Sequence, residues 1–228
     1  MWISIHSSFT YIGSDVDSEG YSSLDIHKRL GMASSIMSQL DNVWRQQRLS
    51  LSTKLRIYSS LVQSVALYGS KTWTLRKVDN SRIQSFHMQA LCRILGIRLY
   101  DKVSSAAVWK RTKLPDLLSL ITDRRHSIFG HVCRLPKNTP ALQTLQLSID
   151  AHTGTAPTAD WKRPPGRPRR TWLQQIEEDC GISVGLAQVT SQDRINQSIN
   201  QTRQFLTRHN TAKPLQGRNR TRPPRPTL

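Results

Sequence analysis

The stretch "SLSTKLRIYSSLVQSVALYG", residues 50–69, decides the fold class, because its apolar residues return at steps of three and four positions. That spacing places side chains on one face of an α-helix. Ser52 is a residue type that caps helix N-termini, and Gly69 is a residue type that ends helices. We therefore predict one helix across this stretch. Its predicted apolar face consists of Leu55, Tyr58, Leu61, Val62 and Val65.

The same periodicity recurs on both sides of this stretch and predicts an all-helical core over residues 22–149. Before it, Ser22 or Ser23 can cap a helix over about residues 24–48. The apolar positions of that helix are Ile26, Leu30, Ala33, Met37, Leu40 and Trp44. Further helices are predicted from Asp79 or Asn80 to Gly96, from Ser104 to Lys113, from Pro115 to Arg134, and from Asn138-Thr139-Pro140 to near Ile149.

Composition divides the rest of the chain into four further segments. Residues 1–21 contain "FTYIGSDVDSEGY", where aromatic and β-branched residues lead into a Gly and Asp turn, so we predict a short β-hairpin. Residues 150–170 are rich in Thr, Ala, Pro and Arg and are predicted to be a basic linker. Residues 171–206 are predicted to be C-terminal helices, and residues 207–228 a disordered basic tail. The predicted fold class is therefore mainly α.

Two patterns define the predicted C-terminal helices. An amphipathic helix is expected from Thr171 to Cys180, with Gly181 as its end. A weaker pattern, rich in Gln and Asn, covers about Ser191 to Leu206.

The charge of the chain indicates a polyanionic partner. There are 33 Lys and Arg residues against 15 Asp and Glu, which gives a formal charge of +18. A field of this sign concentrates nucleic acid, and an anionic membrane surface is the alternative. No apolar run approaches the roughly 20 residues that span a bilayer. We expect RNA or DNA as the partner, and neither a membrane nor a small-molecule substrate.

The cysteines and the first residues favour an intracellular protein. Cys92, Cys133 and Cys180 are odd in number and widely spaced, which argues against a disulfide framework. The opening "MWISIHSSF" has no basic region followed by a long apolar region, so it is unlike a secretory signal. We expect the protein in the nucleus or the cytoplasm.

Five segments, in order, resemble blocks in the carboxy-terminal part of the endonuclease–reverse transcriptase of non-LTR (LINE-type) retrotransposons, in the Jockey and RTE-like range. Together they cover roughly residues 9–180. The segments are "FTYIGSDVDSEG" (9–20), "LSLSTKLRIYSSLVQSVALYGSKTWTL" (49–75), "RIQSFHMQALCRILGI" (82–97), "RRHSIFGHVCRLP" (124–136) and "GRPRRTWLQQIEED" (166–179). The chain departs from the family pattern at Ile12, where Leu is usual, and at Lys71, where an acid is usual.

The resemblance implies roles for the hairpin and the helices. The hairpin corresponds to the primer grip that follows the polymerase palm, where a tight glycine turn lets a backbone approach the primer. Its residues are Phe9, Tyr11, Ile12, Gly13 and Ser14. The helices correspond to the thumb, which clamps the template–primer duplex. The basic residues expected to meet phosphate there are Lys28, Arg29, Lys54, Arg56, Lys71, Arg76 and Lys77. Each of these could instead be an ordinary solvated charge.

No catalytic centre is predicted. A reverse transcriptase holds two Mg²⁺ ions with palm aspartates, two of them in an aromatic-x-Asp-Asp turn, and the sequence contains no such turn. The palm and the endonuclease would lie before residue 9, so we expect a truncated copy that is not a polymerase by itself. Mg²⁺ would serve only the intact parent. His126, His131 and Cys133 do not share one helix face, so no metal site or cofactor is predicted there.

The linker carries a candidate nucleic-acid site. "RPPGRPRR", residues 163–170, is a segment that we call the strap. It resembles an AT-hook, in which proline keeps the chain extended and arginines enter a narrow minor groove. The predicted contacts are Arg163, Arg167, Arg169 and Arg170. Three alternatives remain for this segment and chain: a simple linker, a host DNA-binding or chromatin-associated adaptor that uses the strap as an AT-hook, and a basic helical interaction module without nucleic acid.

Overall fold

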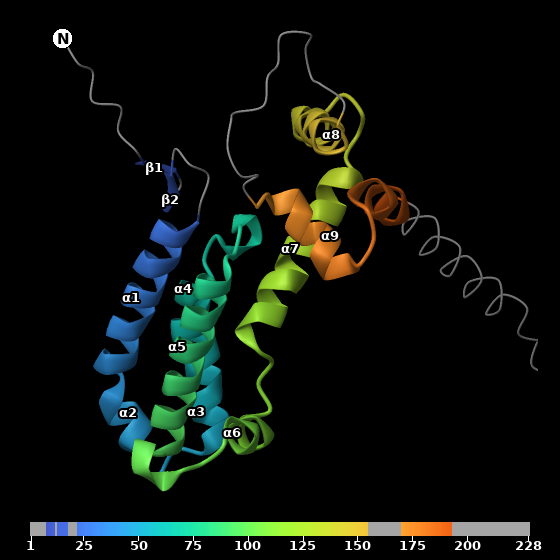
Figure 1. The fold of residues 1–228 in the computed structure, drawn as a ribbon. Coiled ribbons are helices and arrows are strands. Elements are labelled where there is room, and N and C mark those ends of the chain that lie inside the picture. The colour runs from blue at the N-terminus through green and yellow to red at the C-terminus, as the bar shows by residue number, and fades with distance from the viewer. Residues whose placement is uncertain (1–7, 12, 18–21, 155–169, 193–228) are drawn as a thin grey trace, which may run out of the picture.

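The computed structural model describes residues 8–11, 13–17, 22–154 and 170–192, and these are mainly helical, as the sequence predicts (Figure 1). Most of the strap and the whole basic tail lie outside the described residues, as do Ile12 and residues 193–206. The elements are β1 (Ser8–Tyr11), β2 (Ser14–Asp17), α1 (Ser23–Gln39), α2 (Asp41–Arg45), α3 (Leu51–Ile57), α4 (Ser64–Ala66), α5 (Lys77–Leu95), α6 (Ser105–Thr112), α7 (Leu117–Cys133), α8 (Pro140–His152) and α9 (Trp172–Cys180). A further helix covers residues 184–192.

The predicted hairpin is present at the N-terminal side of the bundle. β1 pairs antiparallel with β2, and Tyr11 lies opposite Ser14 at the tight end. Gly13 occupies the turn with φ of 75°, a left-handed conformation that glycine adopts without steric cost. The hairpin contacts α1, so its position is set by the helical core rather than by the two strands alone.

The first part of the core is a bundle built around α1 and α5 (Figure 1). α1 packs against α4 and α5, while α3 and α6 pack against α5. Burial of apolar side chains is the main force that holds such helices together. The buried residues form two neighbouring clusters, which include Ala33, Met37, Trp44, Tyr58, Val62, Leu91 and Ile94 in one and Ile26, Leu67, Trp73, Ile83, Leu117 and Ile121 in the other.

A separate cluster joins the C-terminal helices. α7 contacts both α8 and α9, and the residues between them exclude solvent. The cluster consists of Phe129, Cys133, Ile149, Leu173, Ile176, Val184 and Ala187. α7 also contributes Leu117 and Ile121 to the bundle, so this one helix connects the two parts of the molecule (Figure 1).

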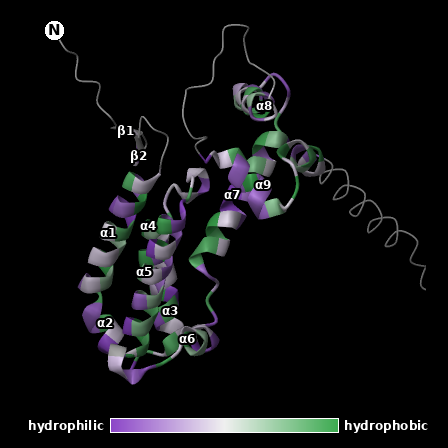
Figure 2. Ribbon diagram, in the orientation of Figure 1, coloured by the Kyte–Doolittle hydropathy of each residue, from purple (hydrophilic) through white to green (hydrophobic). Residues whose placement is uncertain are grey.

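Apolar and polar residues are interleaved along the helices (Figure 2). Each described helix therefore presents a limited apolar face instead of being hydrophobic all round. Within the described part of the chain, no helix combines the length and the apolar character that crossing a membrane requires.

The predicted helix over residues 24–48 is wrong in one respect, because it breaks at Leu40. Leu40 adopts φ of −88° and ψ of 14°, and α2 begins at the next residue. The indole Nε1 of Trp44 donates to the main-chain oxygen of Met37 at 2.9 Å. This hydrogen bond satisfies a carbonyl at the end of α1 and turns Trp44 into the core.

The helix of residues 50–69 also differs from its prediction. Ser50, not Ser52, is the cap, and its hydroxyl accepts from the amide of Thr53 at 3.2 Å. The helix then widens into a π-helical stretch over Tyr58–Gln63 before α4. A π-turn shifts the later side chains around the axis. Leu61, predicted to be apolar core, is consequently 49% exposed.

Most helix ends follow the predicted signals. Ser104 caps α6, Pro140 opens α8, and Gly96 and Gly181 end α5 and α9 with left-handed φ values. α5 is an exception, because it begins at Lys77. The carboxylate of Asp79 then lies inside the first turn, where it accepts from the amide of Arg76 at 3.2 Å.

Candidate nucleic-acid interface

The hairpin is fastened to the bundle by a buried carboxylate. Asp25 on α1 accepts hydrogen bonds from the indole of Trp73 at 2.8 Å and from the amide of Asp15 at 3.3 Å. It also pairs with Arg29, whose Nε lies 3.4 Å from Oδ1. The guanidinium of Arg29 in turn donates to the carbonyl of Gly13 and stacks over Tyr68, 4.3 Å from the ring centroid. The turn of the hairpin is thus bonded directly to α1.

Several of the basic residues predicted to meet phosphate are occupied within the fold. Arg29 is buried, and its prediction as an exposed contact is wrong. Lys28 pairs with Asp15 at 3.0 Å. Lys54 donates from Nζ to the main-chain oxygen of Trp44 at 2.6 Å, at the end of α2.

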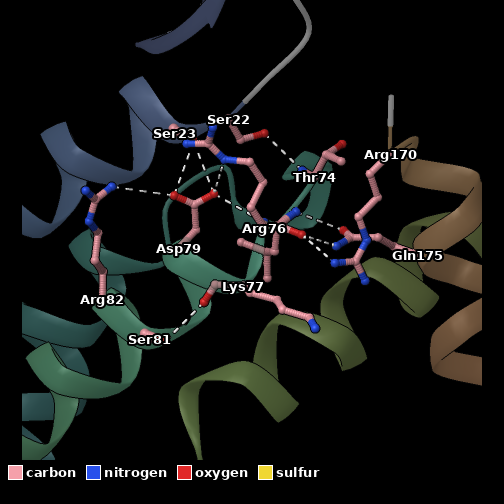
Figure 3. Close-up of polar contacts among 11 residues, drawn as sticks. Ser22, Ser23, Thr74, Arg76, Lys77, Asp79, Ser81, Arg82, Arg170 and Gln175 are labelled. Carbon is pink, nitrogen blue, oxygen red and sulfur yellow. Dashed lines mark hydrogen bonds and ion pairs between the residues drawn. The ribbon is translucent and has the colours of Figure 1, made fainter. Parts of the chain in front are cut away.

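Arg76 is also occupied. It pairs with the buried carboxylate of Asp79 at 3.1 Å and donates to Ser23, so that it joins the start of α5 to the start of α1 (Figure 3). By contrast, Arg56, Lys71 and Lys77 are exposed and form no ion pair with a described residue. Of the helical residues singled out in the sequence, these three keep their charge available.

The strap can be followed only at its last residue. Arg163, Arg167 and Arg169 lie outside the described residues. Arg170 is half-buried and donates from Nη1 to the main-chain oxygen of Leu75 at 3.0 Å (Figure 3). Its other terminal nitrogen pairs with Glu178. Arg170 is therefore engaged in tertiary contacts and does not offer a free guanidinium.

The helix after the strap docks on the loop that precedes α5. Gln175 is buried and forms two hydrogen bonds with Leu75, accepting from its amide at 3.0 Å and donating to its carbonyl at 2.7 Å (Figure 3). Trp172 donates to the main-chain oxygen of Lys71 at 3.0 Å and its ring packs 6.2 Å from that of Phe129. Trp172 thus anchors α9.

A concentration of positive charge lies at the other end of the bundle. Residues 41–57 and 93–116, which we call the basic end, contain ten Lys and Arg and three Asp. They comprise α2, α3, α6 and the end of α5, which Figure 1 shows together, away from the hairpin. The sequence reasoning singled out Lys54 and Arg56 here but missed the run Lys110-Arg111-Thr112-Lys113 on α6, although its composition is a basic signal.

A groove of about 470 Å³ lies between α3 and α6 within the basic end. Arg56 and Arg111 reach it from opposite helices. Leu51, Leu55 and Leu114 line it together with the hydroxyl residues Ser52, Ser59, Ser60 and Thr112. Guanidinium and hydroxyl groups are the donors that proteins offer to phosphate oxygens. None of the described residues that line the groove is acidic.

The thiols and imidazoles of α7 and α9 include one close contact. The Sγ of Cys180 lies 3.5 Å from Nε2 of His126, but burial and the nearby Asp179 raise the pKa of the thiol. A nucleophilic cysteine requires the opposite shift. His131 is exposed and Cys133 is buried, so the two point apart. Among the described residues, no three His, Cys, Asp or Glu side chains converge as metal ligands.

Comparison with known proteins finds similarity to a transposon-derived protein. A curated protein of Caenorhabditis elegans, described as uncharacterized and transposon-derived, is 22% identical over 175 residues. The alignment covers 75% of this chain and 59% of that protein, so the chain spans less than two thirds of the length of its relative. No family model matches the chain, and no solved structure matches it.

Proposed function

We propose that this chain is the nucleic-acid-binding, carboxy-terminal part of a non-LTR retrotransposon reverse transcriptase, and that its basic end holds a phosphate backbone. The transposon-derived relative supports the broader origin. The five ordered blocks in the sequence support the narrower one. RNA or DNA of the element or its target is the proposed partner, and the activity is binding rather than catalysis.

The observation that carries this proposal is the groove between α3 and α6. Arg56 and Arg111 face it without an acidic partner among the described residues, in a region where ten cations stand against three acids. Charges with no protein counter-ion attract polyanions and release counterions when a phosphate neutralises them. Of the other exposed cations that the sequence suggested, Lys28 and Arg76 are paired, and Lys71 and Lys77 lie outside the basic end.

The carboxylates of the described chain support the absence of polymerase chemistry. Hydrogen bonds from Thr10 and Lys28 lower the pKa of Asp15, and the Thr10 contact is 2.6 Å long. Glu178 and Asp179 pair with Arg170 and Arg125. Polymerisation by two metals needs carboxylates that are free to bind Mg²⁺. These groups are used to hold the hairpin and α9 in place.

The test is a titration with a labelled RNA–DNA duplex at several salt concentrations. We expect Arg56→Gln/Arg111→Gln to weaken binding and to flatten the slope of log affinity against log salt by about one to two units. The matched control is Arg134→Gln/Lys137→Gln, which removes the same charge from two exposed residues outside the basic end. If both double variants lose the same affinity, the effect comes from net charge alone, and the proposed site is contradicted.

A further inference from the structure

A second cavity opens at the basic end, nearer to the first turn of α6 than the groove is. It measures about 520 Å³ and lies between the last turns of α5 and the first turn of α6. Its walls are apolar, with Met88, Ile97, Val103 and Val108. Pockets of this size and character are typical of small-ligand and base-binding sites.

Positive charge rims this apolar cavity. Arg93, Arg98 and Lys102 line its edge. Arg93 is neutralised by Asp41, with 2.8 Å between Nε and Oδ1. Arg98 and Lys102 form no ion pair with any residue in the described ranges, because Asp101 uses its carboxylate to cap the amide of Arg98 at 2.7 Å. Two cations therefore stand beside an apolar floor.

An exposed aromatic ring lies beside one of these cations, although Tyr100 is not among the residues that line the cavity. Tyr100 lies in the chain between Arg98 and Lys102, and it is 69% exposed. The guanidinium of Arg98 donates to its hydroxyl and lies 5.7 Å from the ring centroid, which orients the ring. Lys102 adopts a left-handed φ of 49°, a conformation that few non-glycine residues take. A large aromatic side chain this exposed contributes little to the core.

We propose that Tyr100 binds an unpaired base of a single-stranded nucleic acid beside this cavity, with the base stacked on the ring and its flanking phosphates held by Arg98 and Lys102. The proposal rests on the proposed function and names the part of the partner that this site recognises. Aromatic rings beside arginines are the usual platform for unpaired bases. Gln89 and Ser105, which also line the cavity, supply polar groups for the edge of a base.

Single-stranded nucleic acid fits better than a duplex at this position. A duplex buries its base faces in the stack, so it can offer Tyr100 only phosphate and sugar. A single strand offers a planar face to the ring and a phosphate to each cation. The groove at Arg56 and Arg111, by contrast, has hydroxyl and guanidinium donors without an aromatic platform, so it suits backbone alone.

The experiment compares a short oligothymidylate with an abasic strand of the same length, using the full chain and fluorescence anisotropy. Tyr100→Ala is expected to lower the affinity for the oligothymidylate about 5- to 100-fold and to leave the abasic strand unchanged. Tyr100→Phe keeps the ring and is expected to bind both strands as the wild type does. Thermal unfolding monitors the fold, which an exposed side chain should not affect.

The outcomes separate this site from the proposed function. If the wild type prefers the oligothymidylate and only Tyr100→Ala removes the preference, the stacking site is supported. If the wild type binds both strands equally, or Tyr100→Ala weakens both alike or neither, the stacking site is overturned while nucleic-acid binding stands. A wild-type chain that binds neither strand overturns the proposed function and this inference together.

Discussion

Arg170 and Leu75 are 95 positions apart, yet the guanidinium of Arg170 donates to the main-chain oxygen of Leu75 at 3.0 Å. This contact places the last residue of the basic strap within the fold. Together with Gln175, it fixes the start of α9 against the loop before α5 (Figure 3). We therefore expect substitution of Arg170 to act differently from substitution of Arg163, Arg167 and Arg169, because the guanidinium of Arg170 is bonded within the fold.

Gln175→Ala should destabilise the protein through Leu75. The amide of Leu75 loses its acceptor in a buried place, and an unsatisfied buried donor costs about 1–3 kcal/mol. For a chain of this size we expect the melting temperature to fall by about 2–12 °C, measured by circular dichroism. Gln174→Ala removes the exposed neighbouring side chain and should leave the melting temperature unchanged. A comparable loss in both variants would contradict the role of the Leu75 contact.

Local signals in the sequence predict what is local in the structure. Ser104, Gly96 and the pair Thr171 and Gly181 mark helix ends correctly, because a cap acts within a few residues of itself. The fold class followed from the same periodicity. The hairpin turn at Gly13 was equally predictable from its residue types.

The features that the sequence did not predict depend on distant partners. The break at Leu40 needs the indole of Trp44 to reach Met37, and the π-turn at Tyr58 follows from packing of that ring against His87, 5.7 Å away between centroids. The sequence could not tell which basic residues are free to bind phosphate and which are paired within the fold. Arg29 is buried by contacts with other segments, while Arg56 is exposed. Pairing is a property of the tertiary arrangement.

Asp25→Ala should release the hairpin. Removing one partner of a buried ion pair leaves the charge of Arg29 unpaired, which typically costs about 3–5 kcal/mol. In urea unfolding we expect the free energy of unfolding to fall by about this amount. The amide of Asp15, whose hydrogen bond Asp25 accepts, should also exchange its hydrogen faster. Asp15→Ala breaks only the exposed contacts with Lys28 and Thr10 and should cost much less. An unchanged exchange rate in Asp25→Ala would show that the hairpin is held by other contacts.

Acid should destabilise the bundle through His87. Burial lowers the pKa of this imidazole from 6.5 to about 4, although Asp116 and the Pro115 carbonyl partly oppose the shift. The unfolded chain therefore binds a proton more readily than the folded one between these values. The stabilising contribution is fully present above pH 6.5 and is lost as the pH falls towards 4, by up to about 3 kcal/mol.

The measurement is the free energy of unfolding of the wild type and of His87→Gln across this pH range. The variant lacks the imidazole, so the difference between the two curves isolates its titration from that of the carboxylates. A difference that stays constant with pH would contradict the proposed shift.

The purified chain should not extend a primer on an RNA template with either Mg²⁺ or Mn²⁺. The physical reason is the lack of an aromatic-x-Asp-Asp turn in the sequence and the pairing of Asp15 and Asp179 within the fold. Incorporation of labelled nucleotide is the assay, with an active reverse transcriptase as the positive control. Incorporation that persists through repurification would overturn the expectation.

The strap arginines should separate into two groups by what their loss changes. Arg170→Ala removes contacts with Leu75 and Glu178, so it should lower the melting temperature while the salt dependence of binding stays the same. The triple variant of Arg163, Arg167 and Arg169 to Ala should leave the melting temperature unchanged and reduce the salt dependence of binding. If all three residues meet phosphate, the slope of log affinity against log salt should flatten by about two to three units.

Arg167→Ala alone distinguishes a groove-reading strap from one that binds phosphate only. In the first case it should abolish a preference for A·T tracts over mixed duplex, because the narrow minor groove of such tracts attracts arginine. In the second case affinity should fall alike for both duplexes. Titrations of the wild type, Arg167→Ala and the triple variant with the two duplexes at three salt concentrations give these answers. An unchanged slope in the triple variant would exclude the strap from the binding surface and leave the basic end as the site of contact.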